Sequence, residues 1–375
     1  MKCQITKIWL ITPNVVDVLQ FIQSNCLAYL FSSLSSDCAK LRMLAYGSLF
    51  RFVSHLENSR VYCKNIILYV IDLLRNSLDK ENQRVSSVIS VFLAETVSII
   101  VEPGHKLYKP LVSFYLLKPV LDLANVPEFY KFFNSSSLEF REERRWIMTV
   151  LVSGIRSSLE YRLYQKRFIY RQLLSIYESK MSDNDLKSLI LDLLIKTCES
   201  KYALIDLVKK HFFIIWLSSV LNSLLIDEKK IFLFIKMLSI YNLVWKQLGA
   251  VGADERLPLG FLNQMLALGK IIKAKLSSSG VKFEEMFKWE NSDDEQQRCV
   301  LEGFFKASDC VMREISKYEI GHRDEMLSLS ETIETSERKI QNGELDNYSD
   351  LVSFVVSRKR TGETCSQIFW CQMED

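Results

Sequence analysis

Apolar residues recur along this chain with the period of an α-helix, and this period constrains the fold more than any other feature of the sequence. In the clearest example, apolar side chains fall three or four positions apart: Leu186, Leu189, Ile190, Leu193, Leu194 and Cys198. Such spacing places them on one face of a helix, where they pack against a core. Similar stripes run from Leu41 to Leu56 and from Cys63 to Leu78. The sequence therefore predicts a chain of amphipathic helices.

The residues that mark turns and hairpins are scarce, with 6 prolines and 12 glycines among 375 residues. This scarcity argues against an all-β fold. Short polar joints recur about every 20 residues, so we expect paired helices in units of about 40 residues, the size of HEAT and armadillo repeats. We predict an all-α, armadillo- or HEAT-like solenoid at residues 1–345 and a weakly ordered tail at 346–375.

One stretch departs from the regular helix spacing, because four prolines fall within residues 103–127: Pro103, Pro110, Pro119 and Pro127. Each proline lacks a backbone donor and disfavours helix in the residue before it. We expect short helices and turns here, and a Pro-rich interruption of the solenoid.

The charged residues are distributed unevenly. Residues 1–282 contain 37 Lys and Arg against 24 Asp and Glu, whereas residues 283–346 contain 8 against 17. A body with a charge of +13 therefore precedes a segment with a charge of −9. A basic body of this kind favours polyanionic partners such as RNA.

The usual signatures of catalysis and metal binding are absent from the sequence. It contains no phosphate-binding loop, no zincin motif, no nucleophile elbow and no C-x-x-C pair. We expect no enzyme, no metal, no cofactor and no small-molecule substrate. The longest apolar stretch, 212–226, is shorter than the ~20 residues of a membrane span, so we expect a core helix and no membrane. Nine scattered cysteines and the absence of a secretory signal favour an intracellular protein.

The candidate site is a basic segment interleaved with aromatic residues. Its candidate contact residues for RNA or a protein partner are Arg156, Arg162, Lys166, Arg167, Arg171, Tyr161 and Tyr164. Cations neutralise phosphates and aromatic rings stack on unpaired bases. The alternative is solvated charge flanking core aromatics. On one continuous helix Arg162 and Lys166 would face away from the other three basic residues, so a single basic stripe would not form.

Several separate sequence motifs resemble the nucleolar pre-ribosomal-associated protein 1 (Urb-type) family. They are LRMLAYGSLFRF at 41–52, V-P-x-F-Y at 126–130, E-R-x-W at 143–146 and Y-x-L-Y-x-x-R at 161–167. The resemblance extends from about residue 37 to 225, and its motifs are structural, so no active-site residue follows from it. It leads us to expect the C-terminal region of a much longer helical-repeat protein.

The resemblance implies a non-catalytic scaffold in the nucleus and nucleolus. Such a protein would act early in large (60S) ribosomal subunit assembly and in maturation of 5.8S and large-subunit rRNA. Its expected partners are helical scaffold proteins, an RNA helicase and pre-rRNA. The alternative is a protein-only armadillo-like adaptor that binds peptides or partner helices, unrelated to ribosomes.

Overall fold

The computed structural model describes residues 17–224, 230–249, 257–278 and 299–317. In these residues the secondary structure is helical, with no strand. They belong to two compact units, unit 1 (Met1–Leu207) and unit 2 (Val208–Asp375). The predicted tail at 346–375 lies outside the described residues. The all-α prediction is confirmed.

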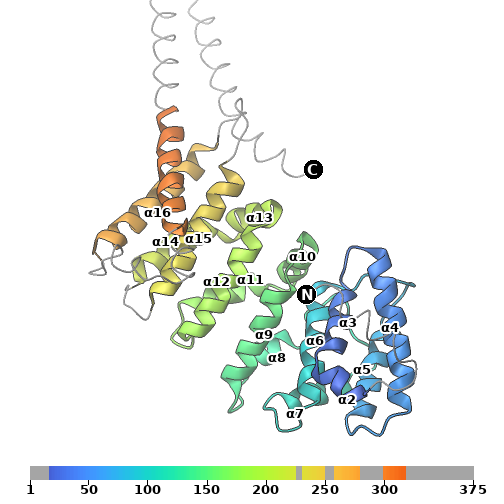
Figure 1. Cartoon of the computed structure of the whole chain (residues 1–375). Helices are drawn as coiled ribbons and strands as arrows, with labels where there is room; N and C mark the ends of the chain where they lie inside the picture. Colours follow the sequence, from blue (N-terminus) through green and yellow to red (C-terminus); the bar gives the residue numbers. More distant parts are fainter. Residues whose placement is uncertain (1–16, 225–229, 250–256, 279–298, 318–375) are drawn as a thin grey trace, which may run out of the picture. The chain divides into compact units, whose positions relative to one another are not determined.

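A row of stacked helices forms the centre of unit 1 (Figure 1). Each member packs against the next, in the order α3 (Cys26–Ser33), α6 (Ser87–Ile100), α9 (Phe140–Gly154) and α12 (Asn184–Cys198). They begin 61, 53 and 44 residues apart, with two further helices between successive members. The solenoid is therefore of the armadillo type, with three helices in each repeat. The expected unit of about 40 residues was too short, because it assumed two helices.

The other helices of unit 1 flank this row. They are α2 (Val18–Gln23), α4 (Ala39–Glu57), α5 (Lys64–Asn76), α7 (Tyr108–Leu116), α8 (Phe129–Phe133), α10 (Ser158–Lys166), α11 (Ile169–Tyr177) and α13 (Lys201–His211), whose last residues lie in unit 2. Helix α6 is apolar on nearly every side, because it packs between α3 and α9 and also touches α5 and α7.

The Pro-rich stretch folds into short helices and turns, as predicted. Helices α7 and α8 have 9 and 5 residues, and the segment between them is irregular. Pro110 lies in the first turn of α7, where a missing N–H costs little. Because α6 packs directly on α9, the interruption affects the connection between repeats and leaves the central row continuous.

Aromatic rings join α6, α7, α8 and α9 into one core. The Trp146 ring centroid lies 5.4 Å from those of Phe92 and Phe132, and Phe92 lies 5.7 Å from Phe114. Beside this core the buried guanidinium of Arg144 donates from Nε to the Phe133 carbonyl at 2.9 Å. The E-R-x-W motif therefore serves the packing of unit 1.

Unit 2 contains α14 (Phe213–Ser223), α15 (Ile231–Leu248), α16 (Leu259–Ser278) and a helix at 299–317. Helix α14 packs on α16 and buries five apolar side chains, as expected for a core helix. In the described residues, α15 alone is long and apolar enough to cross a membrane. It buries seven residues, and its Tyr241 ring lies 5.1 Å from Phe304 of helix 299–317, so it serves as a core helix of this unit.

Candidate nucleic-acid interface

The basic segment is divided between two helices instead of forming one. Helix α10 ends at Lys166, Arg167 follows, and α11 starts at Ile169. Between them Phe168 adopts the left-handed conformation, with φ 53° and ψ 24°. The faces expected for one continuous helix therefore do not apply.

The start of α10 is fixed by a buried carboxylate. Glu160 accepts hydrogen bonds from the backbone N–H of Ser157 at 2.9 Å and from that of Ser87 at 3.2 Å. Ser157 completes a capping box, and Ser87 is the first residue of α6. One carboxylate thus satisfies two helix N-termini and holds α10 against the central row.

Four of the five basic residues are exposed and form no ion pair with the described residues: Arg156, Arg162, Lys166 and Arg171. The Arg162 guanidinium lies 5.0 Å from the ring centroid of Tyr202. Arg156 precedes α10, whose nine residues span about 13 Å, so it lies at the far end from Lys166. The structure gathers Lys166, Arg167 and Arg171 around the turn and leaves Arg156 apart from them.

Arg167 is half-buried and only loosely paired. Its Nη2 lies 3.6 Å from Oδ2 of Asp122, beyond hydrogen-bond distance. Its Nε is buried and donates to no acceptor in the described part of the chain. Because Nε is buried, a ligand can reach only the exposed part of this side chain, which is 37% exposed.

Tyr161 and Tyr164 lie in the core of unit 1, which corrects their assignment as contact residues. The hydroxyl of Tyr161 donates to Oδ2 of Asp206 at 2.7 Å, and that of Tyr164 donates to the Leu151 carbonyl at 2.9 Å. Burial raises the pKa of both phenols above the ordinary value of 10.0. Rings that are fully packed inside the protein have no face for a base.

The exposed aromatic residues at this turn are Phe168 and Tyr130. The Tyr130 hydroxyl donates to the Arg167 carbonyl, which ties α8 to the turn. Sequence periodicity groups Phe168 with the buried tyrosines, because it lies four residues after Tyr164 and seven after Tyr161, the spacing of a continued buried face.

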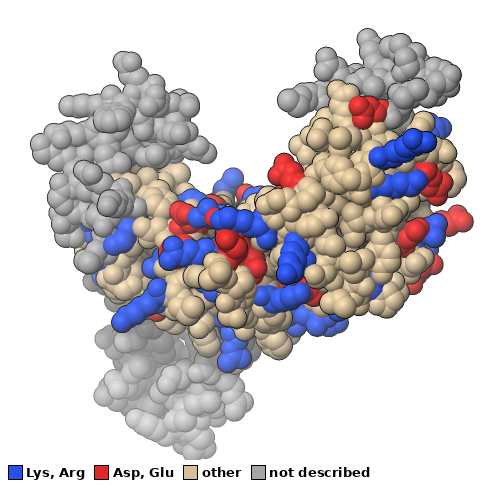
Figure 2. Space-filling model, turned by 90° about the horizontal axis from the view of Figure 1, so that it is seen from below, with Lys and Arg blue, Asp and Glu red and all other residues tan. Residues whose placement is uncertain are grey.

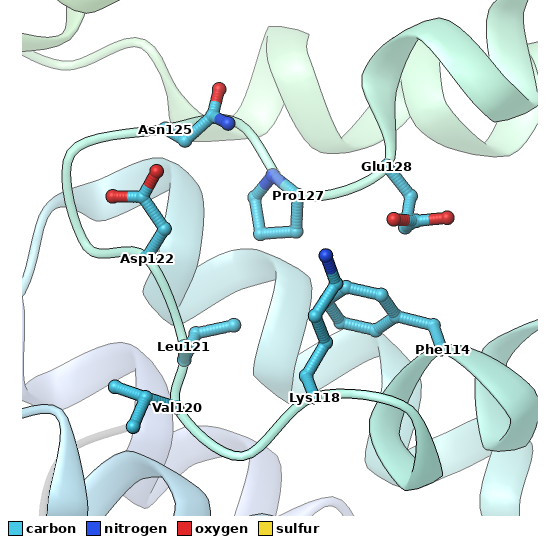
Figure 3. Close-up of a pocket in the computed structure, with 8 residues that line it drawn as sticks. All are labelled: Phe114, Lys118, Val120, Leu121, Asp122, Asn125, Pro127 and Glu128. Atoms are coloured by element: carbon cyan, nitrogen blue, oxygen red, sulfur yellow. The ribbon is translucent and has the colours of Figure 1, made fainter.

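A small pocket adjoins the turn through Asp122 (Figure 3). It has a volume of about 110 Å³ and is lined by Phe114, Lys118, Val120, Leu121, Asp122, Asn125, Pro127 and Glu128. This volume holds a few waters but not a nucleotide or drug-sized ligand, which needs roughly 300 Å³ or more. Within the described ranges, no three His, Cys, Asp or Glu residues gather as a metal site would require.

The charges on the face in Figure 2 are mixed. Lysine and arginine side chains alternate with aspartate and glutamate across it. Binding of a polyanion to this face would therefore depend on local clusters of cations.

The stacked three-helix repeats and the exposed basic turn define an armadillo-type helical-repeat protein. The family model of nucleolar pre-ribosomal-associated protein 1 matches residues 27–216, from α3 into α14. The chain belongs to this family. No solved structure matches it.

Two curated relatives carry that name. The human protein is 29% identical over 231 residues, which cover 62% of this chain and 10% of the relative. The mouse protein is 28% identical over 243 residues, covering 64% of this chain and 11% of the relative. The chain thus spans about a tenth of the length of these relatives.

Proposed function

We propose that this chain is a non-catalytic scaffold of the nucleolus that associates with precursors of the large (60S) ribosomal subunit. The observation that carries the proposal is the family match, which covers the row α3, α6, α9 and α12 and the turn at 166–168. The human and mouse relatives are named as nucleolar and pre-ribosomal. The chain would support early subunit assembly and the maturation of 5.8S and large-subunit rRNA.

A scaffold role agrees with the physical character of unit 1. Stacked repeats present a long surface to partners, and the pocket beside the basic turn is too small for a substrate. Its proposed partners are helical scaffold proteins, an RNA helicase and pre-rRNA.

The test is cosedimentation of the tagged chain with large-subunit precursor particles, with and without ribonuclease. We expect cosedimentation that ribonuclease abolishes. Absence of the chain from these particles under low-salt conditions would refute the proposal.

Two charge-reversal variants test whether the basic turn contacts the particle. Changing Arg156, Lys166 and Arg171 to Glu should weaken particle binding without lowering stability, because these side chains are exposed and form no described ion pair. The matched control changes the exposed cations Lys40, Arg51 and Lys109 to Glu, with an equal change in net charge. Equal loss in both variants would show a general charge effect and no site at the turn.

One observation favours the alternative of a protein-only adaptor. The outer face of α4 exposes Met43 and Phe50, which are seven residues apart and therefore on one side of the helix, and Leu44 next to Met43. Such a face suits a partner helix. Cosedimentation or pull-down that is indifferent to ribonuclease and lost in a Met43→Ser, Phe50→Ser double variant would support this function instead.

A further inference from the structure

Two phenylalanines occupy the same unusual position in successive repeats. Phe168 and Phe212 have φ of 53° and 49°, in the left-handed region, and they are 64% and 66% exposed. Phe168 precedes α11 and Phe212 precedes α14. In each case the residue that follows, Ile169 or Phe213, is fully buried.

The spacing of the repeats shows that the two positions are equivalent. Helices α9 and α12 begin 44 residues apart, and Phe168 and Phe212 are also 44 residues apart. Phe168 follows Lys166 and Arg167 directly, and Phe212 follows Lys209 and Lys210 with His211 between them. The same aromatic and basic device therefore occurs once in unit 1 and once in unit 2.

The exposed ring of these phenylalanines does not serve the stability of the fold. The left-handed conformation is unfavourable for a bulky residue, and glycine or asparagine would adopt it more readily. A ring that stays exposed to water also contributes little hydrophobic stabilisation. The left-handed turn itself belongs to the fold, because Asn25 before α3 and Glu128 before α8 also adopt it. An exposed aromatic ring at two such turns is the feature that indicates a functional constraint.

The groups around Phe168 suit a phosphate. Lys166 and Arg171 are exposed, and the Arg167 side chain is 37% exposed. No side chain caps α11, since Phe168 at its N-cap has no hydrogen-bonding atom. Backbone N–H groups at a helix start favour anions, and the flanking cations add to this field. Asp122 offsets part of the charge of Arg167, so Lys166 and Arg171 are the principal cations.

We propose that Phe168 and Phe212 are stacking platforms for the bases of single-stranded RNA, with the neighbouring cations and helix N-termini binding its phosphates. This inference rests on the proposed function and names the ligand chemistry of the turn. Bases in a duplex are already stacked, so only unpaired nucleotides present a face to the ring. The adjoining pocket of about 110 Å³ is bordered by Asp122 and Glu128, whose carboxylates repel the acidic side chains of a peptide.

The test uses the full chain and a 12-nucleotide single-stranded uridine-rich RNA, with Phe168→Gly and Phe212→Gly. Glycine removes the ring and also relieves the left-handed conformation. We expect each variant to bind RNA roughly 5- to 150-fold more weakly, the range given by loss of one stacked base. The thermal midpoint should stay unchanged or rise. A lowered midpoint with unchanged RNA affinity would show that the rings are structural and would overturn the proposal.

Phe50→Ala is the matched control, because Phe50 is 75% exposed on α4 and adopts ordinary helical geometry. It should leave RNA affinity unchanged. Ultraviolet crosslinking of the wild-type complex should place nucleotide adducts at or beside Phe168 and Phe212. Adducts confined to other helices would contradict the assignment.

Two further outcomes separate this inference from the proposed function. If the wild-type chain binds no free RNA, and its cosedimentation with precursor particles survives both glycine substitutions, the stacking sites are refuted. The scaffold function then still stands. Displacement of RNA by double-stranded RNA or by a poly-glutamate peptide at equal charge concentration would also refute stacking, because both carry anions without unpaired bases.

Discussion

Gly154 marks the closest approach between two helices of the central row, and its replacement by alanine should destabilise unit 1. A Cβ at this position would lie 2.7 Å from Cα of Val88 and 2.9 Å from its Cβ. Optimal carbon separations are about 3.5–4.0 Å, so α9 and α6 would have to separate. The nearest atom belongs to the backbone, and rotation of a side chain cannot relieve the contact.

The expected magnitude follows from two opposing effects. In a helix, alanine is favoured over glycine by up to about 1 kcal/mol. Overpacking of a core costs about 1–3 kcal/mol, and the added Cβ would also approach Oη of Tyr164 at 3.1 Å. Displacement of Tyr164 would weaken its bond to the Leu151 carbonyl, which contributes about 1 kcal/mol. We expect a net loss of about 1–3 kcal/mol in the free energy of unfolding.

Gly47→Ala is the control, because a Cβ at Gly47 on α4 would meet no atom within 4 Å. This substitution should stabilise the protein by about 0.5–1 kcal/mol. Urea denaturation followed by circular dichroism measures both variants. If Gly154→Ala stabilised the protein as much as Gly47→Ala, the close packing of α6 and α9 would be refuted.

Three further predictions concern buried polar groups. Arg144→Leu should lower the free energy of unfolding by about 2–3 kcal/mol in urea denaturation, since the carbonyls of Phe133 and Met181 lose a charged donor. Tyr161→Phe should cost about 1.5–3 kcal/mol, because the buried Asp206 loses the hydrogen bond from the Tyr161 hydroxyl; an unchanged unfolding midpoint would contradict this. Burial raises the pKa of five tyrosines of unit 1 above 10.0, so they bind more protons in the folded state than in the unfolded state at high pH. Stability should be constant with respect to these groups below pH 10 and fall above it, measured by denaturation midpoints and by phenolate absorbance at 295 nm.

The sequence alone determined the helical class of the fold and several of its details. The 3.6-residue period, the scarcity of glycine and proline and the irregular stretch at 103–127 are local properties of the chain, and local hydrogen bonding and side-chain spacing decide them. The charge difference between residues 1–282 and 283–346 is likewise written in the sequence. The stacking of α3, α6, α9 and α12 could not be predicted, because it joins residues far apart in the chain and no repeated sequence motif marks the register.

Tertiary packing decided the candidate site. Tyr161, Tyr164 and Phe168 have the spacing of one buried helical face, and the sequence could not separate them. In the fold, Tyr161 is anchored to Asp206, while Ile169 is buried at the start of α11. To satisfy both contacts, the chain turns between α10 and α11 through a left-handed residue. This turn places the ring of Phe168 in solvent, while Tyr161 and Tyr164 remain in the core.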